Sequence, residues 1–224
     1  SHSGMYHLLH RFGFSWITSR SKHPKHDQEA IEAFKKIRTL VKAVIPKEIT
    51  LDKVDIWFQD ESRVGQQGTQ TRIWAKRGTR PRVVKQQQFI AEYIFGAVCP
   101  SQETVAAIIV PYANQDALIR HLEEIACHVP AGRHAVVVMD QAGWHSTKRL
   151  EIPNNISILH LPPYSPELNP QEQVWQYLKD NFLANRVFND RKDIQKACCN
   201  AWNIFAQNTN LISSLTSRKW AQLF

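Results

Sequence analysis

In the stretch Val136-Val137-Val138-Met139-Asp140, a continuous apolar run is followed directly by an acidic residue. A run of this length and composition is typical of a strand that is covered on both faces. A helix is predicted before it, capped by Asn114 and carrying an apolar stripe that reaches Ile125. Because a helix between two strands usually returns the chain in parallel, Asp140 is expected at the same sheet edge as Asp60, if their strands are neighbours.

A first strand is predicted at residues 54–58, where apolar residues alternate with others, and Asp60 is expected to close it. Two further strands are predicted at residues 89–98 and 104–110. Pro100-Ser101-Gln102 indicates a hairpin turn between them. Three successive strands suggest a meander.

Glu172 lies in a Pro-rich stretch between a predicted strand at residues 156–161 and a long helix predicted from Pro170 onward. Two interpretations of Glu172 stay open. With Asn169 it can form a capping box, in which its carboxylate binds backbone N–H groups. Alternatively it faces a cleft, because the helix has an apolar face that can pack on the sheet and a separate polar face. The apolar face consists of Val174, Leu178 and Phe182, and the polar face of Glu172, Gln176 and Lys179.

The composition indicates one soluble globular domain. The chain has 224 residues and 43% hydrophobic content, which is enough for one buried core and a short appendage. Lys and Arg number 28 against 20 Asp and Glu, and the formal net charge of +8 favours nucleic acid as a partner. Charge alone fits a merely basic soluble protein equally well.

The cysteines and the apolar stretches indicate a cytoplasmic protein. Cys99, Cys127, Cys198 and Cys199 lack paired C-x-x-C spacing, which argues against a zinc or disulfide framework and favours a reducing compartment. No apolar stretch approaches the length of a membrane span, and the N-terminal residues lack the pattern of a secretory signal. We therefore expect no membrane partner.

Asp60, Asp140 and Glu172 together suggest a magnesium site. Carboxylate oxygens are the hard ligands that Mg²⁺ prefers, and two such ions suit phosphoryl transfer. Taken singly, each Asp is better explained as a turn residue that bonds its own backbone. His145 can touch a phosphate, orient a water or simply brace its loop. A zinc site is disfavoured, because no second His or Cys lies beside His145 at zinc-like spacing.

A basic stretch follows the first strand, after a turn predicted at Gly65 and Gly68 and before residues 71–75. An aromatic ring there can stack on a base while cations neutralise phosphates, although a solvated hairpin explains the same pattern. The candidate DNA-binding residues are Trp74, Lys76, Arg77, Arg80 and Arg82, with Lys148, Arg149 and Lys179 as weaker candidates.

The N-terminal residues are expected to form a separate unit. Residues 1–14 predict a helix that stops at Gly13, and residues 15–26 are polar and basic, as in a linker. Asp27 is a suitable cap for the next helix, whose apolar stripe belongs to the core and which Pro46 stops.

These motifs resemble those of DDE transposases of the mariner-type superfamily, specifically of its bacterial insertion-sequence branch. The most specific motif is Leu161-Pro162-Pro163-Tyr164-Ser165-Pro166-Glu167-Leu168-Asn169-Pro170-Gln171-Glu172, followed by Trp175. Two others support it, namely Val138-Met139-Asp140-Gln141-Ala142 with His145, and Gln59-Asp60-Glu61-Ser62. The resemblance covers most of the chain.

The resemblance implies an α/β protein with an RNase H-like fold, in which helices flank a mixed central sheet. It implies that Asp60, Asp140 and Glu172 bind two Mg²⁺ ions, which Mn²⁺ can replace, while Glu61 and Glu167 are neighbours and not ligands. Water would first cleave double-stranded DNA at the transposon ends. The freed 3′ hydroxyl would then attack target DNA, commonly at a TA dinucleotide.

The resemblance also bears on organisation. Residues 1–26 resemble the end of a helix-turn-helix region with a basic linker, and residues 27–224 the catalytic domain, so the chain is expected to be a fragment or one half of a split transposase. Gln141 stands where the family usually has Asn, and Glu172 follows Asp140 more closely than usual. Related transposases join two DNA ends as dimers, so a homodimer is expected in the complex that holds both ends. The protein is expected in the bacterial cytoplasm, associated with the nucleoid.

Two other functions stay open. The first is a DNA-binding remnant without enzymatic activity, whose acidic residues no longer assemble. The second is an RNase H-like nuclease that cuts DNA without strand transfer. Intact Asp60, Asp140 and Glu172 favour an enzyme over the remnant.

Overall fold

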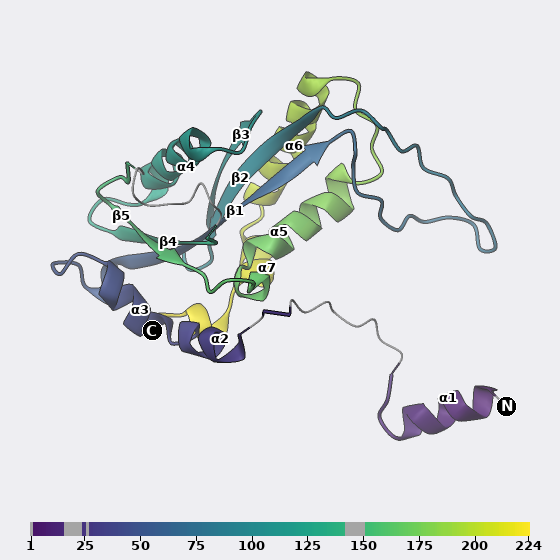
Figure 1. Ribbon diagram of the computed structural model, residues 1–224, viewed down its shortest axis with the longest axis horizontal. Coiled ribbons are helices and arrows are strands. Elements are labelled where there is room, and N and C mark those ends of the chain that lie inside the picture. Colours follow the sequence, from purple (N-terminus) through teal and green to yellow (C-terminus); the bar gives the residue numbers. More distant parts are fainter. Residues whose placement is uncertain (1, 16–23, 26, 142–150) are drawn as a thin grey trace.

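The computed structural model describes residues 2–15, 24–25, 27–141 and 151–224. Its centre is a mixed five-stranded sheet of order β3-β2-β1-β4-β5 (Figure 1). The first three strands form the predicted meander, and β4 and β5 continue the sheet in parallel with β1. The strands are β1 (Val54–Gly65), β2 (Ala91–Cys99), β3 (Thr104–Val110), β4 (His134–Met139) and β5 (Ile156–His160).

Helix α4 (Gln115–His128) connects β3 to β4 and returns the chain in parallel with β1. The Asn114 side chain accepts a hydrogen bond from the Ala117 N–H, which confirms the predicted cap. In the parallel pair, Phe58 lies opposite Val138. The strands that lead to Asp60 and Asp140 are therefore neighbours, as expected.

Strand β1 runs further than predicted. It pairs with β4 only as far as Phe58, and with β2 from Phe58 to Gly65. The prediction that Asp60 closes the strand is wrong, because β2 continues the backbone ladder beyond the last residue paired with β4. Asp60 lies inside the strand, directly opposite Gly96.

Helices cover both faces of the sheet (Figure 1). On one face, Trp57 and Val137 belong to a core that includes Leu118 of α4. On the other face, Phe58 and Val138 belong to a core that includes residues of three C-terminal helices. These helices are α5 (Gln171–Leu178), α6 (Arg191–Ala206) and α7 (Thr209–Thr216). Successive residues of β1 and β4 thus face opposite cores, as the two-residue strand period requires.

The helix predicted after Asp27 is two helices, α2 (Gln28–Phe34) and α3 (Ile37–Val44). Asp27 caps α2 as predicted, because its side chain accepts hydrogen bonds from two backbone N–H groups of the first turn. The break falls at Lys35 and Lys36, where the sequence has neither Gly nor Pro to signal it. The predicted stripe is nonetheless correct, since Ile31, Phe34, Ile37 and Val41 are buried in the core that also contains residues of α5 and α6, and Val44 packs against this core half-buried.

The long helix predicted from Pro170 is also interrupted. After α5 the chain makes a π-helical turn, η5 (Lys179–Leu183), and α6 then begins with Asp190 as its cap. Asn185 has φ +57°, the left-handed conformation that ends helical segments. Short 3₁₀ turns complete the fold at η1 (Leu51–Lys53), η4 (Pro166–Leu168) and η6 (Lys219–Ala221).

Residues 66–90, here called the arm, leave the body between β1 and β2 and contain no helix or strand (Figure 1). The solvated hairpin that was the alternative explanation of this basic stretch has no paired strands here. At the tip, Gly78 has φ +83°, and the Thr79 N–H and hydroxyl both donate to the Lys76 carbonyl oxygen. The arm has few apolar partners, so no packed face selects a strand conformation there.

Helix α1 (His2–Arg11) ends before Gly13, which has φ +80° and is the predicted stop. The apolar side chains of Leu8, Leu9 and Phe12 are exposed. Among the described residues, the structure contains no helix with the length and apolar character to span a membrane.

Candidate active site

Asp60 is partly buried, and the indole N–H of Trp175 donates a hydrogen bond of 2.9 Å to its Oδ2. The pKa of Asp60 is raised to about 8, chiefly by burial and then by the nearby carboxylates of Glu172 and Glu61. The Trp175 hydrogen bond acts in the opposite direction, since it stabilises the ionised form. The site concentrates negative charge around Asp60, and a bound cation would relieve that repulsion.

Asp140 directly follows β4 and is exposed. Its backbone carbonyl oxygen lies 3.2 Å from Nδ1 of His160, at the end of β5. The next residue, Gln141, donates from Nε2 to the Leu161 carbonyl oxygen over 2.9 Å. The Gln141 side chain thus ties the end of β4 to the chain that leaves β5, and Asp140 lies at this junction.

Glu172 lies in the first turn of α5 and is exposed. The capping-box interpretation of Glu172 does not match the contacts, because the Asn169 N–H already donates to the Pro166 carbonyl oxygen. Asn169 instead fixes the start of the helix. Its Oδ1 accepts from the Gln171 N–H over 3.1 Å, and its Nδ2 donates to the Gln59 carbonyl oxygen over 2.9 Å. The helix that carries Glu172 is therefore fastened to β1 beside Asp60.

Asp60, Asp140 and Glu172 line one pocket of about 460 Å³, together with residues of the Pro-rich segment before α5. In the part of the chain that the structure describes, no three His, Cys, Asp or Glu side chains are close enough to form a complete metal site. The three carboxylates still fit Mg²⁺, which retains several waters and is usually held by one or two carboxylates plus substrate phosphates. The pocket thus offers the hard oxygen ligands of such a site and space for a phosphate.

Two family models match the chain. The model described as DDE superfamily endonuclease matches residues 55–195, which include the sheet and all three pocket carboxylates. The chain belongs to this family. A model described as winged helix-turn helix matches residues 1–38, which include α1 and α2. The DDE endonuclease domain therefore forms the main body, and a DNA-binding type of sequence precedes it.

A curated relative of this DDE endonuclease comes from Sinorhizobium fredii, where it is named Uncharacterized protein y4pE/y4sA. It is 50% identical over 129 residues, which make up 58% of this chain and 96% of the relative. The similarity therefore covers nearly the whole of that protein.

Solved structures of Mos1 share the fold of the DDE endonuclease. The chain of the Mos1 strand transfer complex has a TM-score of 0.60 and 13% identity, with 96% of this chain covered. The Mos1 mariner paired end complex with Mg has a TM-score of 0.61 and 17% identity, with the same share covered. This chain spans 66% of the length of each of those chains. The RNase H-like fold, a mixed sheet flanked by helices, is thereby confirmed.

Most of the described DNA-binding candidates of the DDE endonuclease lie on the arm. Trp74, Lys76, Arg77 and Arg80 are all exposed there, and the Trp74 side chain is fully so. Lys179 lies apart from them, half-buried at the start of η5. Three further candidates, His145, Lys148 and Arg149, lie outside the described residues.

The base of the arm is fastened to the segment between η5 and α6. Asn185 Oδ1 accepts from the Thr71 N–H over 3.1 Å, and Asn185 Nδ2 donates to the Thr71 carbonyl oxygen over 3.0 Å. On the other side of the arm, the Gln86 amide donates to the Phe188 carbonyl oxygen and accepts from the Phe188 N–H. An arm that is irregular in itself is thus anchored at both of its ends.

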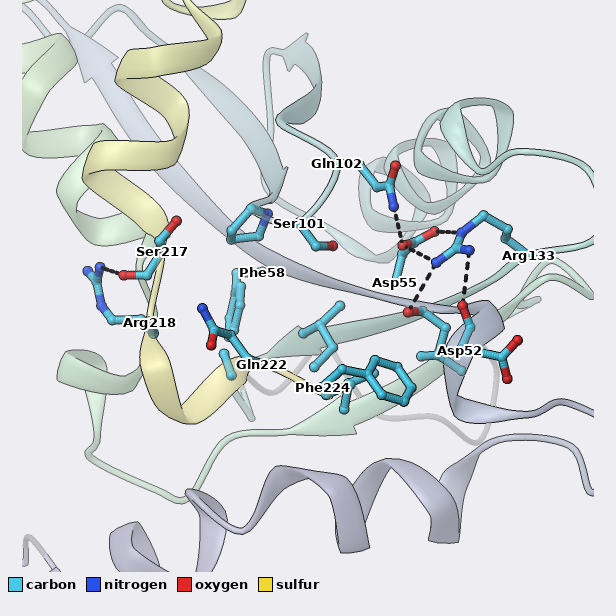
Figure 2. A pocket seen from close by; sticks show the side chains of 15 residues that line it. Asp52, Asp55, Phe58, Ser101, Gln102, Arg133, Ser217, Arg218, Gln222 and Phe224 are labelled. Carbon is cyan, nitrogen blue, oxygen red and sulfur yellow. Dashed lines mark hydrogen bonds and ion pairs between the residues drawn. The ribbon is translucent and has the colours of Figure 1, made fainter.

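A second pocket of about 310 Å³ lies at the opposite end of β1 and is lined in part by C-terminal residues (Figure 2). Its buried carboxylate, Asp55, is already paired, because Arg133 contacts Oδ2 at 2.6 Å and Oδ1 at 2.7 Å. Gln102 adds a hydrogen bond of 2.9 Å to Oδ1. In contrast to the pocket around Asp60, this one has its acidic group neutralised within the fold.

The site contacts of Trp175 and Asn169, and the position of Gly96 opposite Asp60, are not predicted from the sequence. Trp175 belongs to the apolar pattern of α5 and was noted only as part of the family motif. The available signal was its position three residues after Glu172, which places both on neighbouring parts of the helix surface. Gly96 gave no local signal, because it lies in the middle of a strand.

Proposed function

We propose that this chain is a transposase catalytic domain, which cuts double-stranded DNA at transposon ends and joins the freed 3′ hydroxyl to target DNA. The observation that supports it is the gathering of Asp60, Asp140 and Glu172 in one pocket of a DDE endonuclease domain. In the first step, the oxygen of water attacks a phosphorus and the 3′ oxygen leaves as a hydroxyl. In the second step, that hydroxyl attacks a target phosphodiester and releases a 3′ hydroxyl of the target.

In this proposal, Asp60, Asp140 and Glu172 hold the catalytic Mg²⁺, two ions in number, with Mn²⁺ as a substitute. The ions would activate the attacking oxygen and stabilise the leaving oxygen. The chain's own residues set the geometry around them. Asn169 holds the start of α5 against β1, and Gln141 holds the end of β4 against the chain after β5. The three carboxylates then belong to a rigid frame, as catalysis by positioning requires.

The arm forms the proposed main DNA interface. Its exposed cations, including Lys76, Arg77 and Arg80, neutralise backbone phosphates, and Trp74 stacks on an exposed base. Lys179 contacts phosphate from the body, beside the helix that carries Glu172. The remaining candidates, His145, Lys148 and Arg149, follow Asp140 in the sequence and are proposed to contact the same DNA.

We also propose that residues 1–26 belong to a DNA-recognition region and residues 27–224 to the catalytic domain. The winged helix-turn helix match to residues 1–38 supports a recognition role for the N-terminal part. Burial of Ile31 and Phe34 in the main core supports a boundary before α2. In the complex that joins two DNA ends, we expect two copies of this chain.

The deciding experiment is a cleavage and joining assay with a labelled DNA end and a supercoiled plasmid as target. The purified chain is incubated with Mg²⁺, with Mn²⁺ or without metal. We expect metal-dependent cleavage and a joined product that carries the label, and neither from Asp60→Ala or Glu172→Gln. The matched control is Glu167→Gln, which removes a carboxylate of the same Pro-rich motif that does not line the pocket.

Each alternative has its own outcome. Metal-dependent cleavage without any joined product would indicate a nuclease and contradict the strand-transfer part of the proposal. DNA binding without cleavage at any metal concentration would indicate a remnant without enzymatic activity. If Asp60→Ala and Glu172→Gln cleave as well as the unmodified chain, the assignment of the pocket is wrong.

A further inference from the structure

Trp175 connects two of the pocket carboxylates. It lies on α5, three residues after Glu172, and its Nε1–H donates the 2.9 Å hydrogen bond to Asp60 Oδ2. One helix therefore supplies one carboxylate of the pocket and a hydrogen-bond donor to another. Any shift of α5 against β1 would move both together.

The indole is a suitable group to orient a carboxylate that must also bind a cation. Its N–H can only donate, and it carries no charge. It occupies one lone pair of Asp60 Oδ2, and the backbone N–H of Glu61 also donates to this carboxylate, so lone pairs remain for a cation. A Lys or Arg at this place would instead compete with the cation by repulsion.

Gly96 provides the space for this contact. It lies directly opposite Asp60 across the β1–β2 pair. A Cβ at Gly96 would come within 2.6 Å of Cη2 of Trp175, 2.8 Å of Cη2 of Trp202 and 2.8 Å of Nε2 of Gln171. Real Cβ atoms do not approach so closely, so any larger residue at position 96 would displace the indole.

The indole of Trp175 lies in a cluster of aromatic rings. Trp175 is 3% exposed, and its ring centroid lies 6.0 Å from that of Trp202. Trp202 in turn meets Phe205 edge-on at 5.7 Å. Among the described residues, the indole N–H of Trp202 donates no hydrogen bond, so the two indoles share one cluster but only Trp175 is bonded to the pocket.

We infer that Trp175 is a positioning residue, seated on Gly96, which holds the Asp60 carboxylate in the orientation that binds the catalytic metal. The inference rests on the proposed function. It goes beyond a packing role for Trp175, because a buried tryptophan that only fills space would affect stability but not the affinity of the pocket for a cation.

The test compares Mn²⁺ binding to the full chain in Trp175→Phe and Trp202→Phe, with free Mn²⁺ followed by electron paramagnetic resonance. Both changes remove an indole from the same cluster and should lower the melting temperature. We expect Trp175→Phe to raise the Kd for Mn²⁺ about tenfold, the usual effect of losing a hydrogen bond to a ligating carboxylate. Trp202→Phe should leave that Kd unchanged. Cleavage by Trp175→Phe should recover at high Mn²⁺ concentration.

If Trp175→Phe fails to fold, benzothienylalanine at position 175 keeps the ring area, lacks the N–H and should give the same rise in Kd. An unchanged Kd in a folded variant at position 175 overturns the inference and leaves the proposed function intact. Asp60→Ala separates the two ideas. If Asp60→Ala binds Mn²⁺ as tightly as the unmodified chain, the proposed function fails, and the inference fails with it.

Discussion

His121 is a fully buried histidine in α4 with a partner for only one of its ring nitrogens. Its Nε2 lies 3.3 Å from the Ala106 carbonyl oxygen, while Nδ1 is buried without a hydrogen-bond partner in the described structure. Burial lowers the pKa of His121 from 6.5 to about 4, because the imidazolium would be poorly solvated and its second N–H would have no acceptor. The folded chain therefore keeps this ring neutral over most of the acidic range.

This pKa predicts a pH-dependent stability. Because the unfolded ring has the higher pKa, the unfolded chain binds more protons, and stability falls as the pH drops from 6.5 towards 4. The contribution of His121 should decrease by about 2 kcal/mol between pH 7 and pH 5. Urea unfolding of the unmodified chain and of His121→Met at both pH values measures it. Other groups titrate in both proteins, so only the difference between them counts. Equal pH dependence in the two would contradict the prediction.

At the scale of single elements, the segment between η5 and α6 controls the base of the arm. Asn185 holds Thr71 through two hydrogen bonds, and its left-handed backbone suits Asn or Gly far better than Ala. In Asn185→Gly the backbone conformation is kept and the side-chain bonds are lost. The Thr71 amide proton should then exchange about tenfold faster, as expected for the loss of about 1.4 kcal/mol of local protection.

Asn185→Ala adds backbone strain to the same loss of bonds. It should be less stable than Asn185→Gly by about 1 kcal/mol, which thermal unfolding can measure. If the exchange rate of the Thr71 amide proton is unchanged in both variants, the prediction is wrong. The contacts of Gln86 with Phe188 would then be sufficient to hold the base of the arm without the Asn185 side chain.

The sequence predicts the elements best where local pattern and tertiary role coincide. The run before Asp140 is apolar because β4 is covered on both faces, so its pattern identifies both the strand and its end. Asp60 could not be placed in the same way, since the extension of β1 depends on pairing with β2, which is distant in the sequence. The break at Lys35 and Lys36 has no local signal either, and it reflects packing of α2 and α3 on one core.

The candidate site was predicted as three carboxylates, but the contacts that hold them were not. Asn169 looked like a helix cap, while its amide also reaches the backbone of Gln59. The sequence pattern indicates that Trp175 is a core residue, because its apolar ring fits the apolar face of the helix. The pattern does not reveal that its N–H also donates a hydrogen bond to Asp60. Such dual roles depend on a partner from another element, which no periodicity in the sequence reveals.

At the scale of the whole molecule, the net charge of +8 and the exposed arm together predict salt-sensitive DNA binding. Each phosphate contact contributes about −0.9 to the slope of log K against log salt concentration. Arg77→Gln on the arm should therefore make the slope shallower by about 0.9. Trp74→Ala should weaken binding without changing the slope, since an indole carries no charge. Fluorescence anisotropy over a salt series measures both.

The matched control for this charge effect is Arg120→Gln. Arg120 is also exposed, but it lies on α4, on the other face of the sheet from α5, and is paired with Glu123. Its loss should leave the slope as it is. An equal change of slope for Arg77→Gln and Arg120→Gln would mean that the overall charge, and not the arm, attracts the DNA.

The position of Asp60 inside β1 also bears on misfolding. Side chains on a strand alternate between faces, so a slip of one residue between β1 and β2 would turn Asp60 towards α4 and present Gln59 or Glu61 to the pocket. The same slip would exchange Trp57 and Phe58 between their two cores, which differ in shape and in the helices that line them. An error of strand pairing that disrupts the pocket therefore also disrupts both cores. The misregistered chain is destabilised, and correct folding selects the register that assembles the pocket.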